Sequence, residues 1–119
     1  MRPTNNHINY IEFKAYDLKV TKMFYEKAFG WEFTDYGENY TSFSQADSGL
    51  NGGFEKTENK IINGVLVVIY YKDLDKAKQN VINAGGKIIV DIFSFPGGSR
   101  FQFLDPSGNE LAVWKTDEV

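Results

Sequence analysis

Residues 17–30 read DLKVTKMFYEKAFG, and residues 73–86 read DLDKAKQNVINAGG. Both stretches begin with Asp-Leu and end with glycine, so Asp17 and Gly30 correspond to Asp73 and Gly86 at one constant offset. The aspartate is a favoured helix N-cap, because its carboxylate accepts hydrogen bonds from the free N–H groups of the first turn. The closing glycine favours the left-handed conformation that ends many helices. Each stretch is therefore predicted to form the helix of a repeated unit.

Runs rich in β-branched and aromatic residues flank each predicted helix, which is typical of strands. Ile8–Tyr16 precedes the first helix, and Gly64–Tyr71 precedes the second. Three shorter runs follow each helix, at Trp31–Tyr36, Tyr40–Ala46 and Asn51–Glu55 in the first half and at Lys87–Phe95, Arg100–Leu104 and Glu110–Lys115 in the second. Each half is therefore predicted to have the order β-α-β-β-β.

The final strand repeats as well, since GLNGGFEK (49–56) corresponds to GNELAVWK (108–115) at a slightly larger offset. A matching helix start, helix stop and final strand indicate a tandem duplication. We predict an α+β fold with two βαβββ modules, at about residues 7–57 and 62–116, in a single domain of 119 residues. The rival fold is a ferredoxin-like βαββαβ domain, which needs fewer strands than the sequence shows.

The composition limits the classes of function. With 42% hydrophobic and 16% aromatic residues the chain is too apolar to be disordered. It has no cysteine and a single histidine, which excludes thiolate chemistry, disulfides and a site built from several imidazoles of one chain. A net charge of −3 argues against nucleic-acid binding. No apolar run approaches the roughly 20 residues of a membrane span, so we expect a cytoplasmic protein without membrane or nucleic-acid partners.

On these residues the chain resembles the vicinal oxygen chelate superfamily, which includes glyoxalase I, bleomycin-resistance proteins and extradiol dioxygenases. The resemblance is carried by YIEFKAYDLKVTKMFYEKAFGWEF (10–33), DLDKAKQNVINAGGK (73–87) and FLDPSGNELAVW (103–114). It implies that each module curls into half of an open β-barrel, and that the paired modules enclose a cup. It also implies that the chain forms a homodimer.

The resemblance further implies where a metal ion would bind. Metal-dependent members place one ligand seven residues before the helix-starting aspartate and another four residues after the turn glycine of the last strand. These positions are Tyr10 and Gly53 in the first module, and Leu66 and Ala112 in the second. Divalent metals need carboxylate, imidazole or thiolate donors, and these four residues offer only a phenol. We therefore expect no metal and no other cofactor.

Without metal ligands, the same positions predict a pocket for a small organic molecule. Gly53 and Ala112 are small and are expected to leave room for it, while the acidic and aromatic side chains nearby favour an aromatic or cationic ligand. The catalytic residues, if the chain has any, stay unknown at this point. The predicted ligand-binding residues are Tyr10, Glu12, Gly53, Glu55, Leu66, Val68, Tyr70, Glu110, Ala112 and Trp114.

Three alternatives remain open from the sequence. The first is a lyase, isomerase or dioxygenase-type enzyme that uses Glu12 as its acid/base group. The second is a non-standard metal site, because Glu12, Glu55 and Glu110 lie two residues from the mapped positions on the same strand faces. The third is a non-catalytic interaction domain whose interior is filled by its own side chains.

Overall fold

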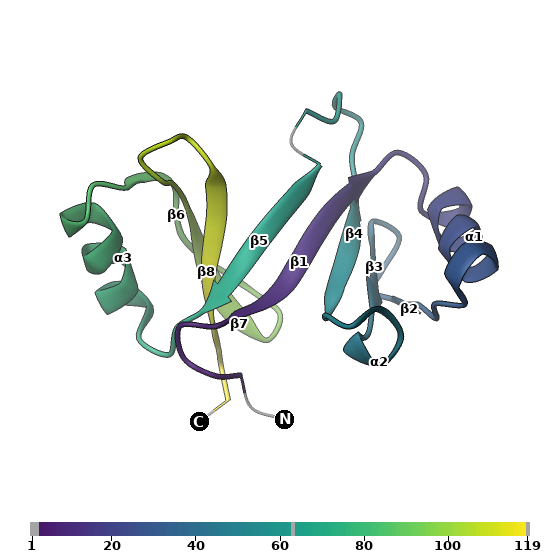
Figure 1. Ribbon diagram of the computed structural model, residues 1–119, viewed down its shortest axis with the longest axis horizontal. Helices are drawn as coiled ribbons and strands as arrows, with labels where there is room; N and C mark the ends of the chain where they lie inside the picture. Colours follow the sequence, from purple (N-terminus) through teal and green to yellow (C-terminus); the bar gives the residue numbers. More distant parts are fainter. Residues whose placement is uncertain (1–2, 63, 119) are drawn as a thin grey trace. The chain divides into compact units, whose positions relative to one another are not determined.

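The computed structural model describes residues 3–62 and 64–118, which form eight strands and three helices (Figure 1). The chain divides into two compact units. Residues 10–66 form the α1 unit, named after helix α1 (Leu18–Phe29), and residues 67–118 with residues 3–9 form the α3 unit, named after helix α3 (Leu74–Asn83). Within the described residues no helix is long and apolar enough to cross a membrane.

The predicted order β-α-β-β-β is present in each half of the chain, and the first half has one additional short helix. The first half consists of β1 (Ile8–Ala15), α1, β2 (Thr34–Asp35), β3 (Tyr40–Phe43), α2 (Gln45–Ser48) and β4 (Gly52–Lys56). The second half consists of β5 (Val65–Tyr70), α3, β6 (Lys87–Phe95), β7 (Gly98–Leu104) and β8 (Glu110–Thr116). The predicted α+β class with tandem βαβββ modules is thereby confirmed.

The two halves also share their strand pairing. Strands follow the order β2-β3-β4-β1 in the first half and β6-β7-β8-β5 in the second, and in each half the first and last strands run parallel. Ile11 is paired with Gly52, and the residues that correspond to them in the repeat, Val67 and Leu111, are paired with each other. The repeat is therefore present in the structure as well as in the sequence.

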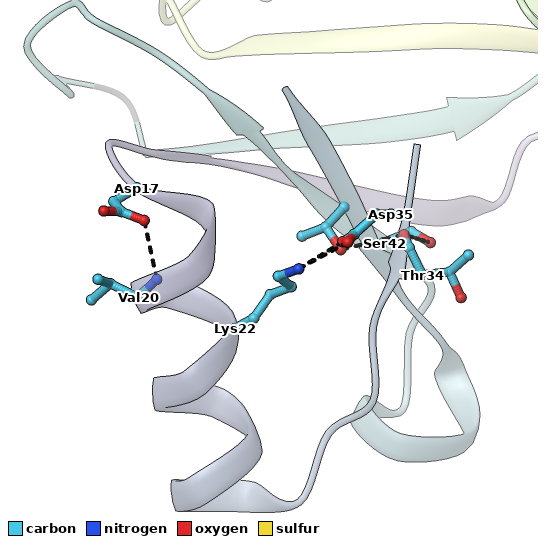
Figure 2. Close-up of polar contacts among 7 residues, drawn as sticks. Asp17, Val20, Lys22, Thr34, Asp35 and Ser42 are labelled. Atoms are coloured by element: carbon cyan, nitrogen blue, oxygen red, sulfur yellow. Dashed lines mark hydrogen bonds and ion pairs between the residues drawn. The ribbon is translucent and has the colours of Figure 1, made fainter. Parts of the chain in front are cut away.

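The helix boundaries follow the predicted caps. The Asp17 carboxylate accepts a hydrogen bond from the Val20 N–H at 3.2 Å (Figure 2). Gly30 ends α1 with a φ of 75°. In the second half, the Asp73 carboxylate accepts from the Lys76 N–H at 3.1 Å. Gly85, with a φ of 100°, follows the end of α3. Both predicted helix starts and the stop at Gly30 are confirmed, and the second stop is at Gly85, one residue before the Gly86 that aligns with Gly30.

Two predicted strands of the first half are wrong in extent. Trp31–Tyr36 contributes only the two-residue strand β2, because Trp31 packs into the aromatic core of its unit. The predicted strand Tyr40–Ala46 stops at Phe43, and α2 begins after Ser44. The Ser44 hydroxyl accepts a hydrogen bond from the Ala46 N–H at 3.0 Å. Such side-chain-to-backbone bonds compete with strand pairing and here end the strand.

Each unit has its own core between its helix and its sheet. In the α1 unit the core is aromatic, with Phe43 and Phe54 buried and the rings of Phe13 and Phe54 stacked at 5.2 Å. In the α3 unit the core is formed by Leu74, Ala77, Phe101 and Val113. Helix α3 thus buries two of its own side chains, whereas α1 buries none of its residues to that degree.

The segment at the start of the chain packs in the α3 unit. The Asn6 N–H donates to the Tyr70 carbonyl at 2.8 Å, and the Tyr70 N–H donates to the His7 carbonyl at 2.9 Å. The indole N–H of Trp114 donates to Asn9 Oδ1 at 3.0 Å. The boundaries of the sequence modules, 7–57 and 62–116, come from the repeat. The boundaries of the compact units differ because the segment before residue 10 packs in the α3 unit.

Candidate functional site

The α1 unit brings Tyr40 of β3 against Gly53 of β4. The antiparallel pairing of these strands sets Ser42 opposite Gly53, so Tyr40 is two residues along on the same face. A Cβ atom added to Gly53 would lie 2.4 Å from the Tyr40 hydroxyl oxygen, far inside van der Waals contact. The expectation that Gly53 leaves room for a ligand is therefore wrong, because the Tyr40 phenol takes that space.

Tyr40 links two residues of β1 that the sequence analysis selected. Its hydroxyl donates to Glu12 Oε2 at 3.2 Å, and the hydroxyl oxygens of Tyr10 and Tyr40 lie 2.5 Å apart. Because a phenol has one hydrogen, Tyr40 donates to Glu12 and accepts from Tyr10. The three side chains, which we call the Tyr-Tyr-Glu group, form a chain of hydrogen bonds that ends on the carboxylate.

The Tyr-Tyr-Glu group is largely removed from solvent. Glu12 is only 5% exposed, and Tyr10 and Tyr40 are half-buried. Burial raises the pKa of the Tyr40 phenol well above its usual range, and the neighbouring Glu12 carboxylate and Tyr10 raise it further. Tyr40 therefore keeps its proton and acts as a donor. Hydrogen bonds to an ionised carboxylate are among the stronger ones in proteins and stabilise it in a buried position.

Glu55 has a different environment from Glu12. Its carboxylate is paired with the ammonium group of Lys14 on the neighbouring strand β1, and both side chains are partly exposed. Glu55 and Gly53 lie on the same face of β4, two residues apart. The α1 unit therefore brings Tyr10, Glu12 and Gly53 together around Tyr40, with the Lys14–Glu55 ion pair further along the same strands.

In the α3 unit the predicted residues of β5 and β8 lie on paired strands. The pairing sets Val68 opposite Ala112 and Tyr70 opposite Trp114. The rings of Tyr70 and Trp114 meet edge to face at 5.4 Å, and Ala112 is fully buried. These positions form an apolar and aromatic face of the α3 unit.

Two further predicted residues lie near the starts of their strands. Glu110, at the start of β8, accepts a hydrogen bond from Gln102 Nε2 at 2.6 Å. Leu66, near the start of β5, is half-buried and belongs to the α1 unit.

The donor set of the described residues does not fit the metal ion that the superfamily resemblance implies. Tyr10 and Gly53 supply only a phenol oxygen, and the Tyr40 side chain occupies the space beside Gly53. Nowhere in residues 3–62 and 64–118 do three or more histidine, aspartate or glutamate side chains gather as metal ligands. Of the three glutamates considered as alternative ligands, Glu55 is paired with Lys14 and Glu110 accepts a hydrogen bond from Gln102.

Two hollows on the surface of the α1 unit are lined by residues outside the Tyr-Tyr-Glu group. One is a polar hollow beside Asp17 and Lys56. The other is shallow and lies on the outward side of helix α1, where its lining residues are Val20, Met23, Phe24, Glu26 and Lys27.

Sequence reasoning missed Tyr40, although a signal was present. Aromatic side chains reach the diagonal neighbour on an adjacent antiparallel strand, so a tyrosine near a paired glycine is expected to lie over it. That inference required the β3–β4 register, in which Ser42 pairs with Gly53. The polar partners Asn9 and Gln102 were missed for the same reason, since each bond joins residues whose pairing the sequence did not fix.

Comparison with known proteins defines the family. The model of the Glyoxalase/Bleomycin resistance protein/Dioxygenase superfamily matches residues 7–113, and the chain belongs to this superfamily. The resemblance inferred from the sequence is thereby confirmed. None of the curated proteins compared with the chain matches it.

Solved structures share the fold. A Mn(II)-bound glyoxalase from Novosphingobium aromaticivorans is 22% identical with a TM-score of 0.68, and the alignment covers 93% of this chain and 39% of the glyoxalase. A superfamily member from Vibrio splendidus 12B01 is 15% identical with a TM-score of 0.69, over 93% and 99% of the two chains. Methylmalonyl-CoA epimerase from Mycobacterium tuberculosis is 12% identical with a TM-score of 0.70, over 98% and 93%. Identities this low establish the fold alone.

Proposed function

We propose that this protein binds a small organic molecule with a cationic amine group, and that it does so in the cytoplasm without a metal ion. The contacting groups are the oxygens of the Tyr-Tyr-Glu group in the α1 unit. The observation that carries the proposal is the Tyr40 phenol against Gly53, at a position where the superfamily resemblance implies a metal ligand. Tyr40 provides an uncharged oxygen there in place of a carboxylate.

The chemistry of the group favours a hydrogen-bond donor as its ligand. The phenol and carboxylate oxygens accept hydrogen bonds, and an ammonium group has only donors. The carboxylate of Glu12 adds attraction for positive charge, which low solvent exposure strengthens. Tyrosine rings add a further attraction for cations that lie over their faces. Membership of a superfamily that includes bleomycin-resistance proteins supports a binding role.

A ligand screen by thermal denaturation tests this proposal. Organic amines are compared with uncharged analogues of the same shape, in buffer that contains EDTA. An amine at a hundredfold excess over its Kd is expected to stabilise the protein by about 2.7 kcal/mol, and the uncharged analogue by much less. Glu12→Gln and Tyr40→Phe are expected to reduce this effect, whereas Glu55→Gln, on the same face but paired with Lys14, is expected to preserve it. Equal stabilisation by amines and uncharged analogues would contradict the proposal.

A second candidate function is acid–base catalysis on a small substrate. The specific observation that favours it is the 3.2 Å contact between Tyr40 and Glu12, which sets a proton donor beside a carboxylate. A carboxylate in this position is able to remove a proton from a carbon next to a carbonyl group, while the phenol donates to the oxygen.

Proton exchange tests this second candidate function directly. Methylmalonyl-CoA, the substrate named for one structural neighbour, is incubated with the protein in D₂O, and exchange at its acidic carbon is followed by NMR. Catalysis predicts exchange that is lost in Glu12→Gln. If methylmalonyl-CoA exchanges only at the uncatalysed rate and the protein binds amines, catalysis is rejected and binding stays the proposed function.

A further inference from the structure

One row of side chains crosses all four strands of the α3 unit. Strand pairing sets Phe93 of β6 opposite Arg100 of β7. It also sets Arg100 opposite Trp114 of β8, and Trp114 opposite Tyr70 of β5. Val113, the neighbour of Trp114, belongs to the core beneath α3. Because successive residues of a strand point to opposite faces, the row lies on the face of the sheet that α3 does not cover.

The row combines aromatic rings with one guanidinium group. The Cζ atom of Arg100 lies 5.3 Å from the centre of the Phe93 ring, so the positive charge is held beside an aromatic face. The ring of Phe95 continues the aromatic surface, at 6.5 Å from the Phe93 ring and 6.4 Å from the Trp114 ring. Phe93 is 37% exposed, and Trp114 and Arg100 are half-buried. This face thus offers ring surface and a positive charge side by side.

The internal repeat relates Arg100 to Tyr40 of the α1 unit. Ala112 and Gly53 correspond in the repeat, and each is paired with a residue of the preceding strand. Arg100 lies two residues before the partner of Ala112, and Tyr40 lies two residues before the partner of Gly53. Where the α1 unit has the central phenol of the Tyr-Tyr-Glu group, the α3 unit therefore has a guanidinium group.

The acidic residues selected in the α1 unit have apolar or aromatic counterparts in the α3 unit. Val68 is at the position that corresponds to Glu12, and Trp114 is at the position that corresponds to Glu55. The duplicated positions therefore differ in charge between the two halves. Carboxylate and phenol oxygens favour a cationic group, whereas a guanidinium group among aromatic rings favours an anionic group attached to an apolar ring.

We propose that this face of the α3 unit binds the carboxylate of a small aromatic acid. The guanidinium group of Arg100 is planar and donates two parallel N–H hydrogen bonds to one carboxylate, a geometry that a lysine ammonium group does not offer. It has five N–H donors, so it binds the ligand in addition to its contacts within the protein. The ring of the acid packs against Trp114 and Phe93. The proposal is independent of the amine ligand proposed above, because it uses a different set of residues.

Binding measurements with small acids provide the first test. Benzoate, phenylacetate and 2-naphthoate are each compared with the uncharged amide of the same shape, and cyclohexanecarboxylate serves as an anion without an aromatic ring. Each aromatic acid is expected to have a Kd at least roughly tenfold below that of its amide, because hydrogen bonds between charged groups are the stronger ones. Benzoate is also expected to bind more tightly than cyclohexanecarboxylate. Saturation-transfer NMR measures these affinities. The absence of binding by all of these aromatic acids at millimolar concentration, or equal affinity for benzoate and either of its control compounds, would overturn the proposal.

Substitution of Arg100 provides the second test. Arg100→Lys keeps the positive charge but loses the planar group, and it is expected to weaken 2-naphthoate binding several-fold. Arg100→Gln removes the charge and is expected to weaken binding further. Lys115→Gln is the matched control, because it removes a positive charge from β8 on the face opposite to Trp114, and it is expected to leave the affinity unchanged.

Melting temperatures show whether each variant is folded, and Arg100→Lys alone is sufficient for the test when Arg100→Gln does not fold. An Arg100→Lys variant that binds 2-naphthoate as tightly as the wild type would contradict the assignment. A loss of affinity in Lys115→Gln as large as that in Arg100→Lys would also contradict it, since the acid would then respond to the general charge of the protein.

Discussion

Lys22 Nζ lies 2.9 Å from both carboxylate oxygens of Asp35, which joins helix α1 to strand β2 within the α1 unit (Figure 2). The α3 unit repeats this ion pair at the corresponding positions, where Lys78 Nζ lies 2.7 Å from Asp91 Oδ1 and joins α3 to β6. The hydrogen bond from Lys22 lowers the pKa of Asp35, and the bond from Lys78 lowers the pKa of Asp91 in the same way. An ion pair between the helix and the strand that follows it is thus present in both halves of the repeat.

The two ion pairs predict matched changes in titration. Lys22→Gln is expected to raise the pKa of Asp35 towards its ordinary value of 3.8 and to leave Asp91 unchanged. Lys78→Gln is expected to do the reverse. Because the folded-state pKa is lowered, each pair contributes to stability above the ordinary pKa, and the contribution is lost as the pH falls through the folded value. Carboxyl NMR shifts between pH 2 and 6 measure both effects, and a change at both aspartates in either variant would contradict them.

Gly53→Ala tests the packing of Tyr40. The added Cβ would lie 2.4 Å from the Tyr40 hydroxyl oxygen, so the variant is expected to lose roughly 1–3 kcal/mol of unfolding free energy. The same substitution is expected to cost much less when Tyr40→Ala has removed the ring. Gly64→Ala is the control, since its nearest neighbour would be at an ordinary 3.6 Å. Urea denaturation measures all four variants, and an equal cost with and without the Tyr40 ring would refute the contact.

Tyr40→Phe tests the hydrogen-bond chain. The variant leaves the buried Glu12 carboxylate without the Tyr40 donor and is expected to lower the unfolding free energy by about 1–3 kcal/mol. Tyr36→Phe is expected to change it by less than about 0.5 kcal/mol, because Tyr36 is an exposed side chain. Chemical denaturation distinguishes the two, and indistinguishable midpoints would mean that the Tyr40 hydroxyl contributes nothing to stability.

Asn9→Ala tests the packing of the N-terminal segment in the α3 unit. The substitution removes the acceptor of the Trp114 indole N–H and is expected to destabilise the protein by about 1 kcal/mol. The fluorescence of Trp114, measured in a Trp31→Phe background, is expected to change in the folded state. Asn59→Ala serves as the control, because Asn59 is exposed and lies in the α1 unit. Unchanged fluorescence and stability in Asn9→Ala would exclude this contact.

The residues at the mapped metal positions also predict that divalent metals do not change the stability of the protein. Added Mn²⁺, Ni²⁺ or Zn²⁺ is expected to leave the melting temperature unchanged, and so is EDTA, because the four residues at the mapped positions offer only the phenol oxygen of Tyr10. A variant with both Tyr10→His and Gly53→Glu is compared with the wild-type protein, because it introduces an imidazole and a carboxylate at two of the mapped positions. Stabilisation of the wild-type protein by a metal would show that the mapped positions are wrong.

The repeated parts of the fold were predictable because they rest on local signals. Asp17 and Gly30 mark the ends of α1 through their own backbone preferences, and the same signals recur at Asp73 and Gly85. The correspondence between the two halves required only a comparison of the chain with itself, and strand pairing preserves it.

The candidate site was only partly predictable, because its contacts join residues far apart in the chain. Sequence reasoning selected Tyr10, Glu12 and Gly53 from the repeat, but the residue that connects them is Tyr40, whose position depends on the register of β3 against β4. The partner of Glu55 likewise followed from strand pairing, which sets Lys14 beside it. Side-chain partners of this kind are not encoded in short sequence windows.

The bond between Trp114 and Asn9 spans 105 residues and has a consequence for how the chain is made. Residues 10–66 are contiguous, so the α1 unit is complete while the rest of the protein is still being synthesised. The other unit needs residues 3–9 as well as residues 67–118, so it is completed only after the α1 unit. Residues 3–9 are thus synthesised before the α1 unit but reach their native contacts after it.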